Sequence, residues 1–314
     1  MRIVIFISMW CVMGLAAPNT ESEAINNYGK QAYISTIGGN DAIVVMDGGT
    51  LSVLYNCVSQ NEIILTPQLS LDGNYISFLI DAGGGNRQLH LLGPLQQVNG
   101  KWRAQDELVT EIASGAWPSY GRNSDFYLTL PAHDLSQYPG ASNIYQLMDG
   151  KFSLVNENRG GEKHLWPLIS PEGNKIHYRK VSKGLDMAGG GQLSLSILYD
   201  LESEEKEEHL ANQNIFVEQW SGTGQLLYSQ KINDNTGTRV YSLYDPKTRE
   251  SQVILETVSR QARLSPDGRY LMTLRAFPEG NNHYDIFIVD LQTKTETNLT
   301  QTEHVSESLI DWIR

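Results

Sequence analysis

Short hydrophobic segments alternate along this chain with tight polar turns, and the combination recurs five times. The copies lie at residues 69–76, 117–127, 169–176, 220–227 and 264–271. The first, third and fifth copies share the turn Ser-x-Asp/Glu-Gly. The turn glycines stand 48, 52, 51 and 44 residues apart: Gly73, Gly121, Gly173, Gly224 and Gly268. A period of about 40–50 residues that consists of strands predicts a β-propeller, in which each repeat forms one four-stranded sheet, or blade.

The turn chemistry explains why the pattern recurs. Proline at the second position, as at Pro171 and Pro266, presets φ for a turn. Aspartate or glutamate is tolerated at the third position, and glycine then adopts the left-handed conformation that closes the hairpin. One copy would fit any β-hairpin, whereas five copies in phase indicate a repeat.

The two ends of the chain predict how the ring closes. Residues 308–312 resemble the first strand of a repeat, but the chain stops before the turn. Near the other end, residues 32–37, 42–47 and 51–55 supply a second, third and fourth strand. Five internal blades and one shared blade predict an all-β, six-bladed β-propeller. Its last blade would be closed by N- and C-terminal strands in a 3+1 arrangement.

The first residues have the pattern of an export signal. Arg2 precedes an apolar stretch that ends at Leu15, and the small residues Ala16 and Ala17 follow. This pattern predicts a cleaved signal peptide, with an uncleaved anchor as the alternative. We therefore expect a signal peptide at 1–17, a flexible arm at 18–29 and the propeller at 30–314, in a periplasmic or secreted protein. No second apolar stretch is long enough for a transmembrane helix, so an integral membrane protein is not expected.

Charge and cysteine content narrow the choice of partners and chemistry. The formal net charge is -12, from 24 Lys+Arg and 36 Asp+Glu, and no basic stripe stands out. This balance argues against a nucleic-acid partner. After cleavage one cysteine remains, Cys57, in an apolar run that predicts a buried small side chain rather than a nucleophile. No intramolecular disulfide is then possible.

The repeat resembles the TolB-type β-propeller repeat of bacterial envelope proteins. The segment at 264–271, together with Asp285 to Asp290 and residues 298–300, carries the resemblance most fully, and residues 166–173 and 69–78 support it. The resemblance covers roughly residues 30–314 and implies the fold and an envelope location. TolB itself has an α/β domain before its propeller, and the arm expected here is too short for one, so the chain resembles a stand-alone relative.

The topology of a propeller separates two faces and points to one of them as the binding face. The tight turns lie on one face, while the longer irregular loops and the crossings between blades lie on the other. Long loops on a rigid scaffold are frequent binding sites. We therefore expect the ligand at the loop-rich mouth of the channel, near seven candidate residues: Trp117, His164, Trp166, Glu218, Arg260, Glu303 and His304.

Each candidate has a functional and a structural interpretation. His164 and His304, beside Glu162 or Glu303, suit a zinc or manganese site, or else form a polar rim. Trp117 and Trp166 would stack a sugar or clamp a peptide, or else pack between blades. No short ligand spacing such as His-x-x-x-His occurs, so no metal and no cofactor are expected.

Two functions fit these observations. The chain lacks a Gly-x-Ser-x-Gly elbow and a His-Glu-x-x-His motif, which favours a binding protein over an enzyme. The first hypothesis is an exported, monomeric, non-catalytic protein that holds an envelope protein or peptide at the channel mouth, as the resemblance to TolB implies. The alternative is a propeller-fold carbohydrate-active enzyme, a polysaccharide lyase or hydrolase. Some polyuronide lyases have similar repeats with a histidine-rich metal centre in the channel.

Overall fold

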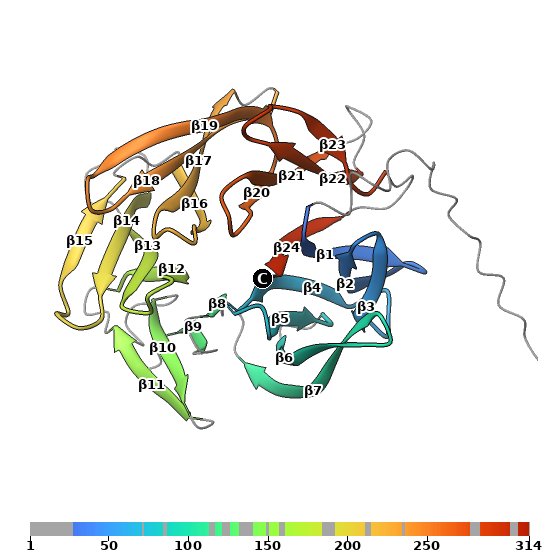
Figure 1. Ribbon diagram of the computed structural model, residues 1–314. Coiled ribbons are helices and arrows are strands. Elements are labelled where there is room, and N and C mark those ends of the chain that lie inside the picture. Colours follow the sequence, from blue (N-terminus) through green and yellow to red (C-terminus); the bar gives the residue numbers. More distant parts are fainter. Residues whose placement is uncertain are drawn as a thin grey trace, which may run out of the picture.

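The fold is a ring of six antiparallel sheets, seen along its axis in Figure 1. The computed structural model describes residues 28–70, 72–83, 87–112, 117–120, 126–131, 141–148, 151–156, 161–183, 192–210, 215–233, 236–276, 283–301 and 307–313. All regular structure within these ranges is strand. The predicted six-bladed propeller is therefore confirmed.

The blades follow one another in chain order, and within each blade the strands are named from the axis outward. Blade 1 consists of β24 (Ser308–Ile313), β1 (Lys30–Ile37), β2 (Asn40–Asp47) and β3 (Thr50–Asn56). Blade 2 consists of β4 (Ile63–Leu69), β5 (Ile76–Asp81), β6 (Arg87–Val98) and β7 (Lys101–Ile112). Blade 3 consists of β8 (Trp117–Tyr120), β9 (Phe126–Pro131), β10 (Ser142–Met148) and β11 (Lys151–Asn156).

The second half of the ring has the same plan. Blade 4 consists of β12 (Lys163–Ile169), β13 (Lys175–Lys183), β14 (Gln192–Asp200) and β15 (Lys206–His209). Blade 5 consists of β16 (Ile215–Trp220), β17 (Leu226–Asn233), β18 (Thr238–Asp245) and β19 (Glu250–Val258). Blade 6 consists of β20 (Gln261–Leu264), β21 (Tyr270–Ala276), β22 (Tyr284–Asp290) and β23 (Glu296–Asn298).

The ring closes in blade 1, where strands from both ends of the chain pair. β24 is antiparallel to β1, with Lys30 opposite Ile313 and Gln31 opposite Trp312. The Trp312 ring is buried, and its Nε1 donates to the backbone oxygen of Arg263 in blade 6, at 3.1 Å. The C-terminal strand thus joins the first and last blades, as the 3+1 arrangement predicted.

The repeated turns have one geometry. In blades 2, 4, 5 and 6 a serine amide donates across the turn at 2.7–2.8 Å, and the turn glycine amide donates back to the serine oxygen at 2.9–3.2 Å. These glycines have φ between +73° and +80°: Gly73, Gly173, Gly224 and Gly268. Only glycine adopts this backbone conformation without steric cost, which is why it recurs. The fifth turn glycine, Gly121, lies outside the described residues.

Apolar side chains fill the spaces between neighbouring blades. One cluster joins blades 1 and 2 and includes Ile43, Cys57 and Phe78. Cys57 is buried, and burial raises the pKa of its thiol to about 11. The prediction of a buried cysteine is confirmed, and a thiol with a raised pKa forms little thiolate at neutral pH.

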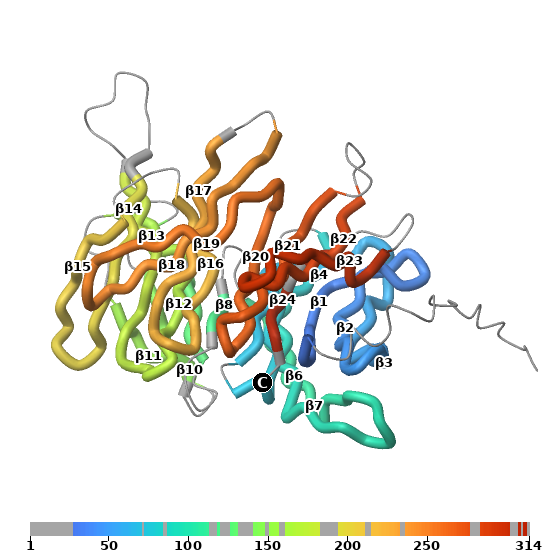
Figure 2. The backbone as a smooth tube through the Cα atoms, turned by 45° about the horizontal axis from the view of Figure 1, so that its top comes forward, coloured from blue at the N-terminus to red at the C-terminus, as the bar shows by residue number. Residues whose placement is uncertain are grey.

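A long hairpin of blade 2 adds hydrogen bonds across the same junction between blades 1 and 2. β6 and β7 form the hairpin that projects beyond its neighbours in Figure 2. Near its tip, Trp102 Nε1 donates to Asp47 Oδ2 at 2.9 Å, and the Trp102 amide donates to Ser52 Oγ at 3.0 Å. Both acceptors belong to blade 1, so the hairpin supports the blade that closes the ring.

The N-terminal segment precedes the described part of the chain. Residues 1–27, which include the predicted signal peptide and most of the predicted arm, lie outside the described residues. In the described ranges there is no helix long and apolar enough to cross a membrane.

Candidate functional site

The six inner strands surround a cavity on the propeller axis. In blades 2, 4, 5 and 6 a tight turn follows the inner strand, so these inner strands begin at the opposite face of the ring, here called the mouth. The cavity has a volume of about 500 Å³, and β24, β4, β8, β12, β16 and β20 all contribute to its lining. A cavity of this size is typical of sites for small ligands or peptide side chains.

Bulges in four inner strands shape this cavity. The strand register shifts within β4, β12 and β16, and again where β24 pairs with β1. In β4 and β12 the bulge residue precedes a proline and has positive φ: +46° at Thr66 and +52° at Trp166. A bulge re-aims a side chain. Thr66 and Trp166 both line the cavity as a result.

Trp166 forms the aromatic wall of the cavity. Its ring meets Phe216 of blade 5 edge-to-face, with centroids 5.4 Å apart. The Arg179 guanidinium lies 5.5 Å from the centroid of the indole. Three prolines extend this wall, so three blades present rigid apolar surface next to the aromatic pair: Pro67, Pro118 and Pro167.

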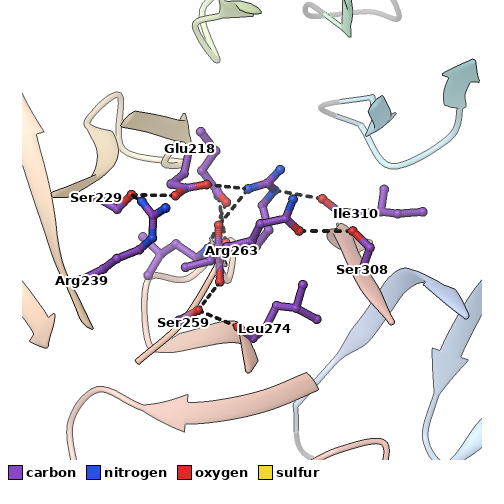
Figure 3. A network of polar contacts seen from close by, with 12 residues as sticks. Glu218, Ser229, Arg239, Ser259, Arg263, Leu274, Ser308 and Ile310 are labelled. Carbon is purple, nitrogen blue, oxygen red and sulfur yellow. Dashed lines mark hydrogen bonds and ion pairs between the residues drawn. The ribbon is translucent and has the colours of Figure 1, made fainter. Parts of the chain in front are cut away.

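Glu218 forms the charged wall and is the bulge residue of β16. Ser229 Oγ donates to its Oε1 at 2.9 Å, and Arg263 Nη1 donates to its Oε2 at 3.3 Å (Figure 3). Arg239 Nη1 donates to the same Ser229 oxygen at 3.0 Å. Arg263 in turn donates through Nε to the Ile310 oxygen at 3.0 Å. The network therefore links blades 5, 6 and 1 around the mouth.

The ionisation of Glu218 is set by two opposing effects. Its carboxylate is 2 % exposed, and burial raises its pKa. The nearby charge of Arg263, the Ser229 hydroxyl and the charge of Arg239 oppose that rise. A buried carboxylate of this kind is tolerated only because it is paired.

A groove between blades 5 and 6 adjoins the axial cavity. It has a volume of about 770 Å³ and shares Gln261, Glu307 and Ser308 with the cavity. Ser308 Oγ donates to Gln261 Oε1 at 3.3 Å at this boundary. The groove and the cavity are thus adjacent, with these three residues between them.

The predicted site residues fall into four groups. Trp166 and Glu218 line the axial cavity, and Arg260 lines the groove, with its guanidinium 4.2 Å from the Tyr284 ring centroid. Trp117 lies in β8 opposite Thr129, but its side chain is outside the described residues, as are Glu303 and His304.

His164 is the predicted residue that lies away from both depressions. Its ring packs on Tyr178 of β13 with centroids 4.7 Å apart, and its Nε2 is 3.8 Å from Glu162 Oε2. Burial lowers the pKa of His164 to about 4. Side chains alternate along a strand, so a residue near the start of an inner strand faces the neighbouring sheet as readily as the channel.

The metal interpretation finds no donor set in the part of the chain that is described. No group of three or more His, Cys, Asp and Glu side chains converges among these residues. The axial cavity is lined there by three carboxylates and no histidine: Asp41, Glu218 and Glu307. Asp41 Oδ2 accepts the Ile64 amide at 3.2 Å, and Glu218 is paired as above.

Several residues of the mouth had not been singled out from the sequence. Arg239, Arg263 and Gln261 lie on strands and belong to no motif. The register of β17 and β18 places Lys231 opposite Arg239 at the mouth. The bulge that places Glu218 beside the cavity has no signal in the sequence.

Comparison with known proteins shows what the fold resembles. No protein-family model matches the chain, and no curated protein does. Among solved structures, TolB from Acinetobacter baumannii is 16% identical with a TM-score of 0.65, covering 92% of this chain and 67% of that one. The putative TolB from Agrobacterium tumefaciens is 13% identical with a TM-score of 0.54, covering 86% and 88%. An oligogalacturonate lyase in complex with manganese is 11% identical with a TM-score of 0.53, covering 87% and 74%.

These likenesses establish the TolB-type propeller fold. Similar folds occur in TolB and in a lyase, so at such identities the function has to be argued from the site itself.

Proposed function

We propose that this chain is an exported, non-catalytic binding protein of the bacterial envelope that holds a segment of a partner protein at the mouth of the channel. The observation that carries the proposal is the chemistry of the axial cavity. Its lining mixes an aromatic pair, three prolines and the amides of Gln68 and Gln261. Aromatic surface binds apolar side chains, and amide groups pair with a peptide backbone.

The rigidity of the site supports binding as its role. Every inner strand is held in a four-stranded sheet, and the Glu218 network fixes three blades relative to one another. A preorganised surface lowers the entropy that binding costs. The likeness to two TolB structures is consistent with this role.

The alternative, a propeller-fold lyase or hydrolase, rests on the likeness to the oligogalacturonate lyase. It requires groups that hold a metal or transfer a proton beside the sugar. The carboxylates Asp41 and Glu218 are already engaged, one by a backbone amide and one by an arginine. Calorimetric titration with Mn²⁺ separates the two: stoichiometric binding together with uronide cleavage would favour the enzyme.

The binding proposal is tested with peptides selected from a random display library against the purified protein. Selected peptides should bind the parent and lose about 30-fold in affinity on Trp166→Ala, the size expected of a central aromatic residue. The matched control is Phe152→Ala, because Phe152 is exposed on β11, the outer strand of blade 3. Peptides that bind both variants as tightly as the parent would contradict the proposal, as would a library that yields no binder.

A further inference from the structure

The groove between blades 5 and 6 has a charge opposite to that of the whole chain. Among the described residues that line it, four are cations and one is an acid: Lys231, Arg239, Arg260, Arg275 and Glu307. The chain as a whole carries 36 Asp+Glu against 24 Lys+Arg. A groove with low-dielectric walls concentrates such a field, so this excess attracts anions.

The cations come from strands that the ring brings together. Lys231 and Arg239 are directly opposite each other on β17 and β18. Like charges in that position repel each other, so the pair adds positive potential to the groove. Arg260 and Arg275 approach from blade 6, on the other side of the groove.

The arginines of the groove differ in how far neighbouring carboxylates offset their charge. Arg275 Nη1 contacts Glu296 Oε1 at 2.5 Å, so its charge is largely offset. Arg239 donates to Ser229, whose hydroxyl is bound to Glu218, and that carboxylate also pairs with Arg263. One buried carboxylate therefore serves two arginines, and a positive charge remains on the groove side.

Arg260 is presented differently, because its guanidinium lies over the Tyr284 ring with its centre 4.2 Å from the ring centroid. Stacking on an aromatic face orients the group while its N–H donors point outward from the edge. A guanidinium held in this way matches the two oxygens of a carboxylate.

We propose that this groove is a carboxylate-binding subsite that receives acidic side chains of the peptide held in the axial cavity. The inference rests on the proposed function, since the peptide reaches the groove past Gln261, Glu307 and Ser308, which line both depressions. Lys231 and Arg260, both exposed, supply the charge that the ligand meets first.

The test uses two synthetic peptides, acetyl-(Glu-Ser)3-amide and its neutral match acetyl-(Gln-Ser)3-amide. Their binding to the mature protein is measured by calorimetry at about 20 mM and about 500 mM salt, where charge screening differs strongly. We expect the acidic peptide to bind at low salt, to weaken at high salt, and to bind far more tightly than the neutral one.

Variants then locate the site. Arg260→Gln and Lys231→Gln should each weaken the acidic peptide about tenfold and together about 100-fold, as expected for two charge-assisted contacts. The control is Arg249→Gln, an arginine of the same blade as Lys231 that is 71 % exposed and contacts Glu207 on the outside of the ring. Equal losses from the control and the groove variants would overturn the proposal, because binding would then follow overall charge.

Two further outcomes separate this inference from the proposed function. Tetragalacturonate is titrated in parallel: its binding to the groove without binding of the acidic peptide would overturn the assignment to peptides. Display-selected peptides that depend on Trp166 but not on Arg260 or Lys231 would leave the proposed function standing and overturn the subsite. Acidic peptides that depend on the groove but not on Trp166 would support the subsite and contradict the axial site.

Discussion

Blade 5 packs against blade 4 on one side and blade 6 on the other. The two junctions differ in whether their buried polar groups have partners. Toward blade 4, Trp220 and Tyr244 pack in an apolar cluster beside two buried histidines, His177 and His209. The two imidazole rings are 5.3 Å apart, and none of their nitrogens has a well-formed hydrogen-bond partner among the described residues. Toward blade 6, the buried polar groups are charged and paired.

The difference shows what a junction needs in order to carry a site. At the blade 4 junction, burial lowers the pKa of both histidines, so the rings stay uncharged and pack as aromatic spacers. At the blade 6 junction, Glu218 and Arg263 form an ion pair, and the pairing offsets part of the cost of burying the carboxylate. Cations of this junction face the groove and give it a positive potential. The uncharged junction between blades 4 and 5 has no such potential to attract a ligand.

The largest expected effect is a loss of stability in acid, which acts on the buried, uncharged histidines. His209 has a pKa lowered to about 4, chiefly by burial, whereas an unfolded histidine titrates near 6.5. Below pH 6.5 the unfolded state binds the extra proton, so stability falls as the pH drops toward 4 and levels off below that. His164, also with a pKa of about 4, behaves alike at the junction with blade 3. Together the two should lower the free energy of unfolding by about 7 kcal/mol once the pH is below both pKa values, and His177 adds to the loss.

Urea unfolding at steps of pH between 7 and 4.5 measures this effect. The control variant is His209→Phe, which keeps a ring against Tyr244, 5.4 Å away in the parent. The variant should be about as stable as the parent at pH 7, because it removes unpaired buried nitrogens. Its stability should fall less steeply with acid. A parent and variant with the same slope would show that His209 is not held neutral by the junction.

The second-largest expected effect comes from removing one partner of the ion pair between blades 5 and 6. Arg263→Met leaves the Glu218 carboxylate buried without its principal counter-charge, and we expect a loss of about 3–5 kcal/mol in urea unfolding at pH 7. The double variant Glu218→Leu/Arg263→Met should recover much of the loss, since an apolar pair of similar size avoids the buried charge. The matched control is Arg269→Met, which removes an arginine from the exposed turn face, where its partner is Asp290 at 2.8 Å. The control should change stability only marginally.

Equal losses from Arg263→Met and Arg269→Met would contradict the distinction between the two faces. So would a double variant that is less stable than Arg263→Met, since the pair would then act through packing rather than charge.

A contrast between local turns and the groove between two blades explains which features the sequence could predict. Turns are local: Ser265, Asp267 and Gly268 interact with one another within four residues, so their chemistry is legible in the sequence and predicts the fold. The groove is not local. Arg239 and Arg275 both line the groove only because two neighbouring sheets pack side by side. The strand register in each sheet decides which side chains face the groove.

Single bulges add a second obstacle. One extra residue in β16 places Glu218 toward the network, and one in β12 gives Trp166 its positive φ. His164, two residues before Trp166, was predicted at the mouth by position along the strand, whereas its ring packs on Tyr178. Position along an inner strand is predictable from the repeat, but the direction of each side chain depends on bulges, and only those at Pro67 and Pro167 have a signal in the sequence.

The smallest expected effect comes from the glycine of the blade 6 turn. Gly268 has φ +73°, and an added Cβ would meet no atom within 4 Å, so Gly268→Ala carries only the backbone cost of a left-handed alanine. We expect a loss of about 1–2 kcal/mol in urea unfolding, and a smaller loss for Gly268→Asn, because asparagine tolerates this conformation better.

The equivalent change in blade 5 provides a comparison. At Gly224, with φ +80°, the added Cβ would come 3.3 Å from Glu172 Oε1, a side chain in the corresponding turn of blade 4. Gly224→Ala should therefore cost more than Gly268→Ala, and Glu172→Ala should remove the excess but leave the common backbone cost. If the two alanine variants were equally stable, the Glu172 side chain would have moved aside without cost, and its contact with the blade 5 turn would not contribute to the difference.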